Sequence, residues 1–495
     1  MHSSIALTII LSIPHLRDEI ASSLTAQDLS VCCQVSSTAN RCFSPLLWKN
    51  LPFTSQQVVA QFQTGSVAQQ GLVRNAKHVR SIDSYFCYAF QSLPETMVFQ
   101  NLFRLCSLAS ELHNKGIVDH ITTERLLTFV KMNESLRELT LTNFPLANQS
   151  VSSLLGEVIA GHPELRSVTI SCFSEADLAS VQDVLRGVAR SVNLEKLSLV
   201  SRSTLFWSDE MQKVLDENNG TSSDRAYTLF RPEEQGNSET CRLTDLTIDF
   251  DLERSLYVTL LPLLRLCPEI KRLFVPAFSV ERSMSHLCQV LERHCPKLQH
   301  LEACYSNGKD EHQEGLINAS QHLKSLSLRS ALPLQKRSIS ALLQYRHCHS
   351  LERLDLRHCS SIESQHLQLL LTSCQNLVSF EAMSDTAQPS TFDPRIDIRD
   401  LPVLSKKPAW ACRGLRVLHI GFSGFSNLAG DRPGCAQPYV DYIYNQLAEL
   451  TELRTLHLGG EMPLSSSSAI VSTAERVEDI ERATAQASPD WEGRG

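Results

Sequence analysis

Leu351-Glu352-Arg353-Leu354-Asp355-Leu356-Arg357-His358-Cys359 contains the apolar pattern from which the fold is predicted. Leu354 and Leu356 alternate with charged residues, and this period of two predicts a strand with one apolar face. The same Leu-x-x-Leu-x-Leu hexad recurs, with Ile, Val, Phe or Ala sometimes replacing a Leu. The hexads begin at Leu136, Leu165, Leu194, Leu243, Ile270, Leu298, Leu323, Leu351, Leu377, Leu415 and Leu453.

The spacing of the hexads is that of leucine-rich repeats, since most successive starts differ by 25 to 29 residues. Helical periodicity follows many hexads, as at Met284, Leu287, Leu291 and Cys295, which lie three or four residues apart. One strand and one helix cannot bury their own apolar faces, but stacked units can. The sequence therefore predicts an α/β solenoid, a leucine-rich-repeat horseshoe with parallel strands inside and helices outside.

Cysteine marks the joint between a helix and the next strand, as in Cys267-Pro268-Glu269-Ile270 and Cys295-Pro296-Lys297-Leu298. The 16 cysteines contain no Cys-x-x-Cys pair, so neither a metal site nor a redox motif is indicated. Free cysteine at a repeating position behaves as a small buried hydrophobe. We therefore expect reduced thiols and a cytoplasmic or nuclear location.

Charge and hydropathy exclude two classes of partner. Lys and Arg number 46 against 54 Asp and Glu, a net charge of −8, which gives no reason to expect nucleic acid. No segment approaches the ~20 apolar residues of a membrane helix, and the apolar run from Ile5 to Ile13 lacks the basic start of a signal peptide.

Residues 13 to 51 do not follow the repeat and predict three short helices. Leu16, Ile20 and Leu24 share one face of the first helix. Thr25 is a suitable N-cap for a second helix, and Leu47-Trp48 begins or follows a third.

This segment resembles the F-box. The pattern is matched, in order and spacing, by Pro14, Ile20, Leu24, Asp28, Leu29, Val35, Leu47 and Trp48. The resemblance implies binding to the Skp-family adaptor and, through it, to a cullin. The residues expected to bind the adaptor are Pro14, Leu16, Ile20, Leu24, Leu29, Val35, Leu47 and Trp48.

The repeats, from about residue 78 to 460, resemble the cysteine-containing leucine-rich repeats common in F-box proteins, of the fungal type here. Cys359 stands where many repeats carry Asn. Fewer than 40 residues in three helices bury too little surface to be stable alone, so leftover apolar residues would pack on a partner. The alternative is that residues 13 to 51 only cap the solenoid.

The predicted domains are an F-box over 1–52, a helical linker over 53–77 and the repeats over 78–460. Loops 201–241 and 384–412 are polar or proline-rich insertions, and 461–495 is a disordered tail. Val79 with Ile82, and Leu102 with Leu105, are weaker candidates for the first repeats.

A substrate protein would meet the outward-pointing residues of the central hexads. The predicted contacts are Arg272, Phe274, Arg329, Arg353, Asp355 and Arg357. Neighbouring parallel strands lie ~4.8 Å apart, so Arg329 and Arg357 are expected side by side, and an anion between them is favourable. Either Asp355 supplies that anion internally, or an acidic or phosphorylated segment of a substrate does.

No phosphate-binding loop, His-Glu-x-x-His motif or nucleophile elbow occurs, and no cofactor or metal is indicated. The sequence thus favours a non-catalytic adaptor of a ubiquitin ligase. The alternatives are a repeat scaffold or inhibitor without a ligase, and an extracellular recognition protein, which the dispersed thiols disfavour.

Overall fold

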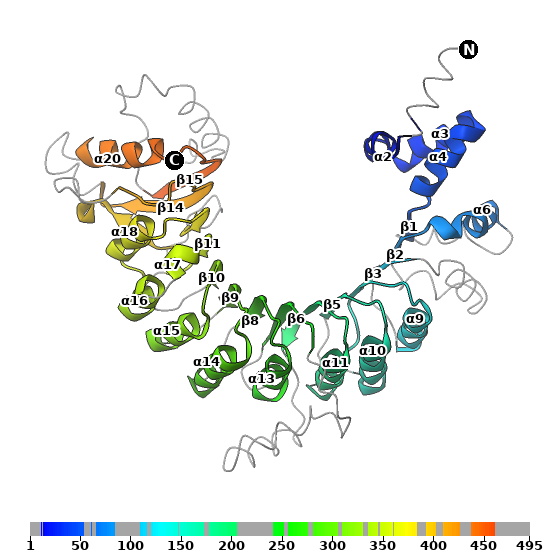
Figure 1. Cartoon of the computed structure of the whole chain (residues 1–495), viewed down its shortest axis with the longest axis horizontal. Coiled ribbons are helices and arrows are strands. Elements are labelled where there is room, and N and C mark those ends of the chain that lie inside the picture. Colours follow the sequence, from blue (N-terminus) through cyan, green and yellow to red (C-terminus); the bar gives the residue numbers. More distant parts are fainter. Residues whose placement is uncertain are drawn as a thin grey trace, which may run out of the picture. The chain divides into compact units, whose positions relative to one another are not determined.

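The computed structural model of the chain describes residues 11, 13–53, 61, 66–84, 109–115, 120–146, 148–172, 178–204, 241–251, 256–275, 281–304, 309–329, 335–344, 347–359, 361–383, 393–401, 409–425 and 437–460. The chain forms two compact units, Met1–Phe250 and Asp251–Gly495. Each unit contains parallel strands with helices along one side of them (Figure 1).

The first unit begins with three helices, α2 (Pro14–Ser22), α3 (Ala26–Val35) and α4 (Ser37–Leu47). Its strands follow in chain order and are β1 (Asn50–Phe53), β2 (Ser81–Ser84), β3 (Glu111–Lys115), β4 (Glu138–Thr142), β5 (Ser167–Cys172), β6 (Lys196–Thr204) and β7 (Asp245–Asp251). The intervening helices are α6 (Val67–Asn75), the 3-10 turn η1 (Ala76–His78), α9 (His120–Met132), α10 (Gln149–Gly161) and α11 (Leu178–Arg190).

The second unit repeats this arrangement. Its strands are β8 (Arg272–Val275), β9 (His300–Cys304), β10 (Ser325–Arg329), β11 (Arg353–Asp355), β12 (Ser379–Glu381), β13 (Arg395–Asp397), β14 (Val417–Ser423) and β15 (Thr455–Gly460). Its helical elements are α13 (Leu256–Leu266), α14 (Glu281–His294), α15 (Asp310–Ala319), α16 (Lys336–Gln344), α17 (His347–Ser350), α18 (Ser364–Ser373), η3 (Ile398–Asp400) and α20 (Gln437–Ala448).

The hexads pair in register, which confirms the predicted α/β solenoid. Leu326 of β10 lies opposite Leu301 of β9 and Leu354 of β11. These leucines point toward the helices and are buried, while the residues between them point to the other face of the sheet. Burying each such leucine contributes roughly 1.5–3 kcal/mol, so stacking the repeats supplies much of the stability.

Several strands differ from the predicted pattern. β1 and β3 carry no hexad; the weak candidate at Leu102 to Leu105 lies outside the described residues. β13 lies within the predicted insertion 384–412 and pairs in parallel with the end of β14, beyond the part of β14 that pairs with β12. β6 extends to Thr204, inside the predicted insertion 201–241. The rest of that insertion up to residue 240, and the tail 461–495, are not described.

The cysteines at the joints tie each repeat to the one before it. Cys295 and Cys412 donate hydrogen bonds to the carbonyls of Leu264 and Leu371, in the last turn of the preceding helix. Carbonyls in that turn lack partners within their own helix. Burial raises the pKa of Cys295 to about 12 and that of Cys412 to about 11, so both thiols are unreactive.

His347 also links segments of neighbouring repeats through a hydrogen bond. Its Nδ1 accepts a hydrogen bond from the backbone N–H of Leu323 at 3.2 Å, which requires an unprotonated nitrogen. Burial lowers the pKa of His347, and this favours the same neutral state.

Helices α10 and α11 approach each other through Gly156 and Gly187. A Cβ built on Gly187 would overlap the backbone of Gly156, and one on Gly156 would meet the carbonyl oxygen of Asp183. Gly161, at the end of α10, has nothing within 4 Å of such a Cβ. The first two glycines therefore set the spacing of the two helices.

Candidate functional site

The N-terminal helices form a small motif with its own core. Buried residues from α3 and α4 meet there, together with Leu11: Leu29, Cys33, Ala39 and Phe43. Thr25 caps α3, accepting from the N–H of Asp28, while Asp28 accepts from the N–H of Thr25 at 3.0 Å. The pKa of Asp28 is lowered first by the hydrogen bond that the Thr25 hydroxyl donates to its carboxylate at 2.7 Å, and then by the bond from the Thr25 backbone N–H.

Three large apolar side chains of this motif remain exposed. Val31 and Val35 are 57% and 69% exposed, and their spacing of four places them on one face of α3. Ile20 of α2 is 38% exposed. Val31 and Val35, as neighbours on α3, are the larger apolar exposure of the motif.

The predicted adaptor contacts divide into three groups. Pro14, Ile20 and Val35 are exposed, and Leu16, Leu24 and Leu47 are half-buried. Leu29 is only 8% exposed, so it supports the motif from inside. Val31 was missed by the sequence reasoning, although its i, i+4 relation to Val35 is a usable signal.

Trp48 joins the motif to the repeats. Its ring atoms lie 3.0 and 3.1 Å from the position that a Cβ on Gly71 of α6 would occupy. Because glycine is what allows this close approach, Trp48 is committed to an internal contact.

A second candidate surface is the face of the second unit's strands that points away from the helices. Strand pairing aligns its side chains in two rows. The first row is Arg272, His300, Ser325, Arg353 and Ser379. The second row is Phe274, Glu302, Ser327, Asp355, Glu381, His419 and His457.

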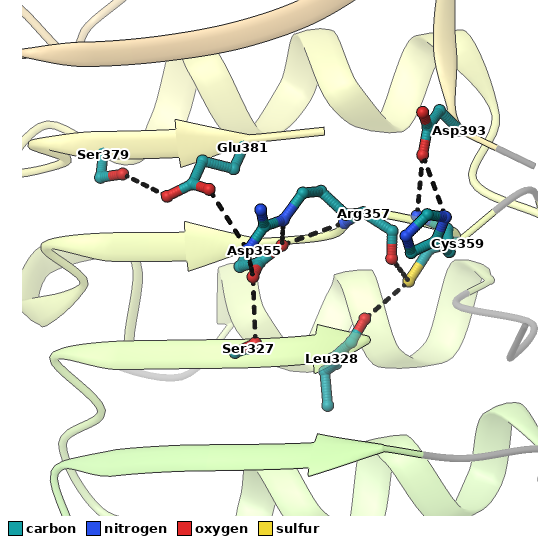
Figure 2. Close-up of polar contacts among 9 residues, drawn as sticks. Ser327, Leu328, Asp355, Arg357, Cys359, Ser379, Glu381 and Asp393 are labelled. Atoms are coloured by element: carbon teal, nitrogen blue, oxygen red, sulfur yellow. Dashed lines mark hydrogen bonds and ion pairs between the residues drawn. The ribbon is translucent and has the colours of Figure 1, made fainter. Parts of the chain in front are cut away.

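Arg357 lies between two carboxylates of the second row, as Figure 2 shows. Its Nε and Nη2 donate to the two oxygens of Asp355 at 2.9 and 2.7 Å, and Nη2 lies 3.5 Å from Glu381. Ser327 donates to Asp355 at 3.2 Å, and Ser379 donates to Glu381 at 3.1 Å. Both carboxylates thus have hydrogen-bond or ion-pair partners within the protein.

This network contains one of the two predicted alternatives for Arg357, while its contact with a substrate stays a prediction. The internal pairing with Asp355 is present, and Asp355 itself is buried. Sequence reasoning missed Glu381, which the register of β12 on β11 places beside Asp355. The side chain of Arg329 lies outside the described part, so its predicted approach to Arg357 stays a prediction.

Arg272 and Arg353 in the first row are exposed, and Phe274 in the second is half-buried. His300 lies between the two arginines in the row. Its pKa is lowered first by burial and then by the positive charges of Arg272 and Arg353. This part of the surface is therefore basic, with a neutral imidazole within it at neutral pH.

A contact between His358 and Asp393 holds the segment that carries β13. Asp393 is buried and accepts a hydrogen bond from the backbone N–H of His358 at 3.1 Å. His358 adopts a positive φ of 66°, a conformation uncommon outside glycine. Cys359, next in the chain, donates to the carbonyl of Leu328 at 2.9 Å, which explains a hydrogen-bonding residue at this repeat position.

Two further observations concern metal ions and membranes. Among the described residues, no group of three or more His, Cys, Asp or Glu is arranged to hold a metal ion. Within the same part of the chain, every helix is too short or too polar to cross a membrane.

Comparison with known proteins adds little. No protein-family profile and no curated protein sequence match the chain. Among solved structures, it is similar to the one described as the crystal structure of the Rad7 and Elc1 complex in yeast. The identity is 13% and the TM-score 0.27, over 84% of this chain and 93% of that chain. A likeness this distant carries no argument about family, partner or activity.

Proposed function

We propose that this chain is the non-catalytic substrate-recognition subunit of a cullin-based ubiquitin ligase. Helices α2 to α4 bind a Skp-family adaptor, and the sheet surface of the second unit binds the substrate protein. The proposal rests on the resemblance of residues 13–51 to the F-box. The observation that carries it is the exposure of Ile20, Val31 and Val35 on a small motif that is followed directly by a repeat solenoid.

The apolar exposure accounts for adaptor binding in physical terms. Water around Val31 and Val35 is released when a partner covers them, which contributes roughly 1.5 kcal/mol or more for each side chain. Leu29 and Phe43 hold α3 and α4 together beneath them. The motif thus presents a preformed apolar surface, and little ordering is required on binding.

We assign fewer residues to the substrate-binding surface than the sequence predicted. Asp355 and Arg357 serve each other, so we assign partner contacts to Arg272, Arg353 and Phe274 instead. Exposed arginine beside an aromatic ring is a combination enriched at binding hot spots. An acidic protein segment is the partner that these residues fit. We place the complex in the cytoplasm or nucleus.

A scaffold function without a ligase is the second candidate, favoured by one observation. Trp48 packs on Gly71, and α4 leads directly into β1, so the motif also covers the first repeats. In that case Val31 and Val35 would contact no adaptor.

The test is co-expression of the full chain with the Skp-family adaptor, followed by size-exclusion chromatography. Point variants are preferable to removing residues 1–52, because that deletion would also remove most of β1. Val31→Asp with Val35→Asp is expected to abolish co-elution. The matched control is Val67→Asp with Val192→Asp, which changes two exposed valines outside the motif and should retain it. Failure of the unmodified chain to co-elute would leave the scaffold function.

A further inference from the structure

We propose that the junction between the helical motif and the first strands is a docking surface for an acidic polypeptide segment. The charge of the sequence around this junction differs from that of the whole chain. Residues 29 to 82 contain Arg41, Lys49, Arg74, Lys77 and Arg80 but no Asp or Glu, in a chain whose acids outnumber its bases by 54 to 46. This local reversal of sign is independent of the F-box resemblance.

Four of these cations come together in the structure, and we call them the junction patch: Lys49, Arg74, Lys77 and Arg80. The backbone N–H of Arg80 donates to the carbonyl of Lys49 at 2.8 Å, which brings the end of the helical motif against the start of β2. The guanidinium of Arg80 donates to the carbonyl of Lys77 at 2.9 Å. Arg74 precedes Lys77 by three residues, in the last turn of α6.

The junction patch is rigidly mounted. Trp48, next to Lys49, packs on Gly71 of α6, so the two segments that carry the cations are in contact. Leu72 and Ala76 are buried beneath the same helical stretch. The backbone positions of the four cations are therefore held before a partner binds, so no segment of backbone has to be ordered on binding.

Within the described residues, none of the four cations forms an ion pair. Elsewhere in the same unit, exposed arginines do pair, as in Arg137 with Glu164 at 3.6 Å and Arg166 with Glu195 at 3.4 Å. The pKa of His78 is lowered by burial and further by the charges of Lys77 and Arg80, as expected where positive charge is not compensated.

Stabilisation of helix ends is the simpler explanation and covers part of the observation. Arg74 and Lys77 lie in last turns, where a cation interacts favourably with the helix dipole. Lys49 directly follows the C-cap of α4, so the same effect extends to it. Stabilisation of helix ends gives no reason, however, for the lack of acids from residue 29 to 82.

The occupant that fits is a short acidic protein segment rather than nucleic acid. Four cations can contact about four phosphates, and so few contacts contribute little electrostatic affinity for nucleic acid. The net charge of −8 repels a long polyanion, whereas a short segment contacts the junction patch alone.

The test measures fluorescence anisotropy of a labelled, alternating Glu-Gly peptide on the purified full chain. We expect saturable binding that weakens as salt is raised, and none for a Gln-Gly peptide of the same length. Arg74→Glu with Lys77→Glu is expected to weaken binding by about tenfold or more. The matched control is Lys131→Glu with Arg190→Glu, two exposed cations in last turns of α9 and α11, which should change it by less than about twofold.

Three outcomes would overturn the proposal: equal binding of the Gln-Gly peptide, unchanged binding by the patch variant, or an equal loss in the control. Tighter binding of single-stranded oligouridine than of the Glu-Gly peptide would identify a nucleic-acid surface instead. Arg74→Gln with Lys77→Gln guards against misfolding, because an intermediate loss is expected from neutralisation. No adaptor is present, so the result stands apart from the outcome of the co-elution experiment.

Discussion

Replacing Arg357 by Gln should destabilise the second unit of the chain. The guanidinium makes two charge-assisted hydrogen bonds to Asp355, at 2.9 and 2.7 Å, and lies 3.5 Å from Glu381. Asp355 and Glu381 stand on paired strands, and their side chains are only 12% and 25% exposed. Without Arg357, two neighbouring carboxylates lose this cation and remain partly buried.

The magnitude follows from this geometry. Breaking a fully buried ion pair costs about 3–5 kcal/mol, because the remaining charge stays desolvated. Partial exposure of Glu381, and the hydrogen bond that Gln can still donate, reduce the loss to about 2–3 kcal/mol. At about 2–4 °C for each kcal/mol in a unit of this size, Tm should fall by about 5–10 °C.

Thermal unfolding followed by circular dichroism is the assay. Arg353→Gln is the matched control; this exposed residue lies on β11 with Asp355, and its replacement should change stability by less than about 0.5 kcal/mol. Adding Asp355→Asn to Arg357→Gln should recover part of the loss, because one of the two carboxylates is removed. Arg357→Gln at wild-type stability would refute the internal role of Arg357.

Three further predictions concern stability and reactivity. Gly187→Ala should destabilise the first unit by about 1–3 kcal/mol in urea unfolding, since its Cβ meets backbone, whereas Gly161→Ala should be neutral. The pKa of His347 is lowered in the folded state, so the unfolded chain binds the proton more readily, and stability should fall as pH drops below about 6.5. His347→Gln should flatten that dependence in urea titrations at several pH values. Mass-spectrometric mapping after brief iodoacetamide treatment of the native protein should find Cys32 labelled well before Cys295, whose pKa is raised to about 12.

Each of these three predictions has an outcome that would contradict it. Equal stability of the two glycine variants would mean that the helices do not meet as described. An unchanged pH profile in the histidine variant would show that another group titrates. Rapid labelling of Cys295 would mean that its joint opens easily in the native state.

The hexads allowed most strands and their register to be predicted, because a repeat that must stack on its neighbour leaves one alignment of its leucines. The strands that lack a hexad were not predicted from the sequence. β3 contains Leu112 as its one aliphatic core residue, and β13 contains Ile396 alone between two charged residues. Such strands form because a neighbour offers them a sheet edge, and this information is not local to their sequence.

In the candidate sites, too, some residues could be placed from local sequence and others could not. Sequence spacing placed Val35 on the motif and Arg353 on the strand surface, since both follow from periodicity. It could not decide whether the side chain of Arg357 turns back to Asp355 or outward to a partner. The second carboxylate beside Arg357, that of Glu381, reaches the site through the pairing of β12 with β11 and not through local sequence.

The most direct test of the adaptor assignment is isothermal titration of the purified Skp-family adaptor into the full chain and its variants. Two valines that lose apolar burial and gain carboxylates at the interface should cost about 3 kcal/mol or more. The account predicts that Val31→Asp with Val35→Asp weakens adaptor binding by about a hundredfold or more, and that Val67→Asp with Val192→Asp leaves it unchanged. Equal affinity of the two variant proteins, or no heat of binding from the unmodified chain, would contradict it.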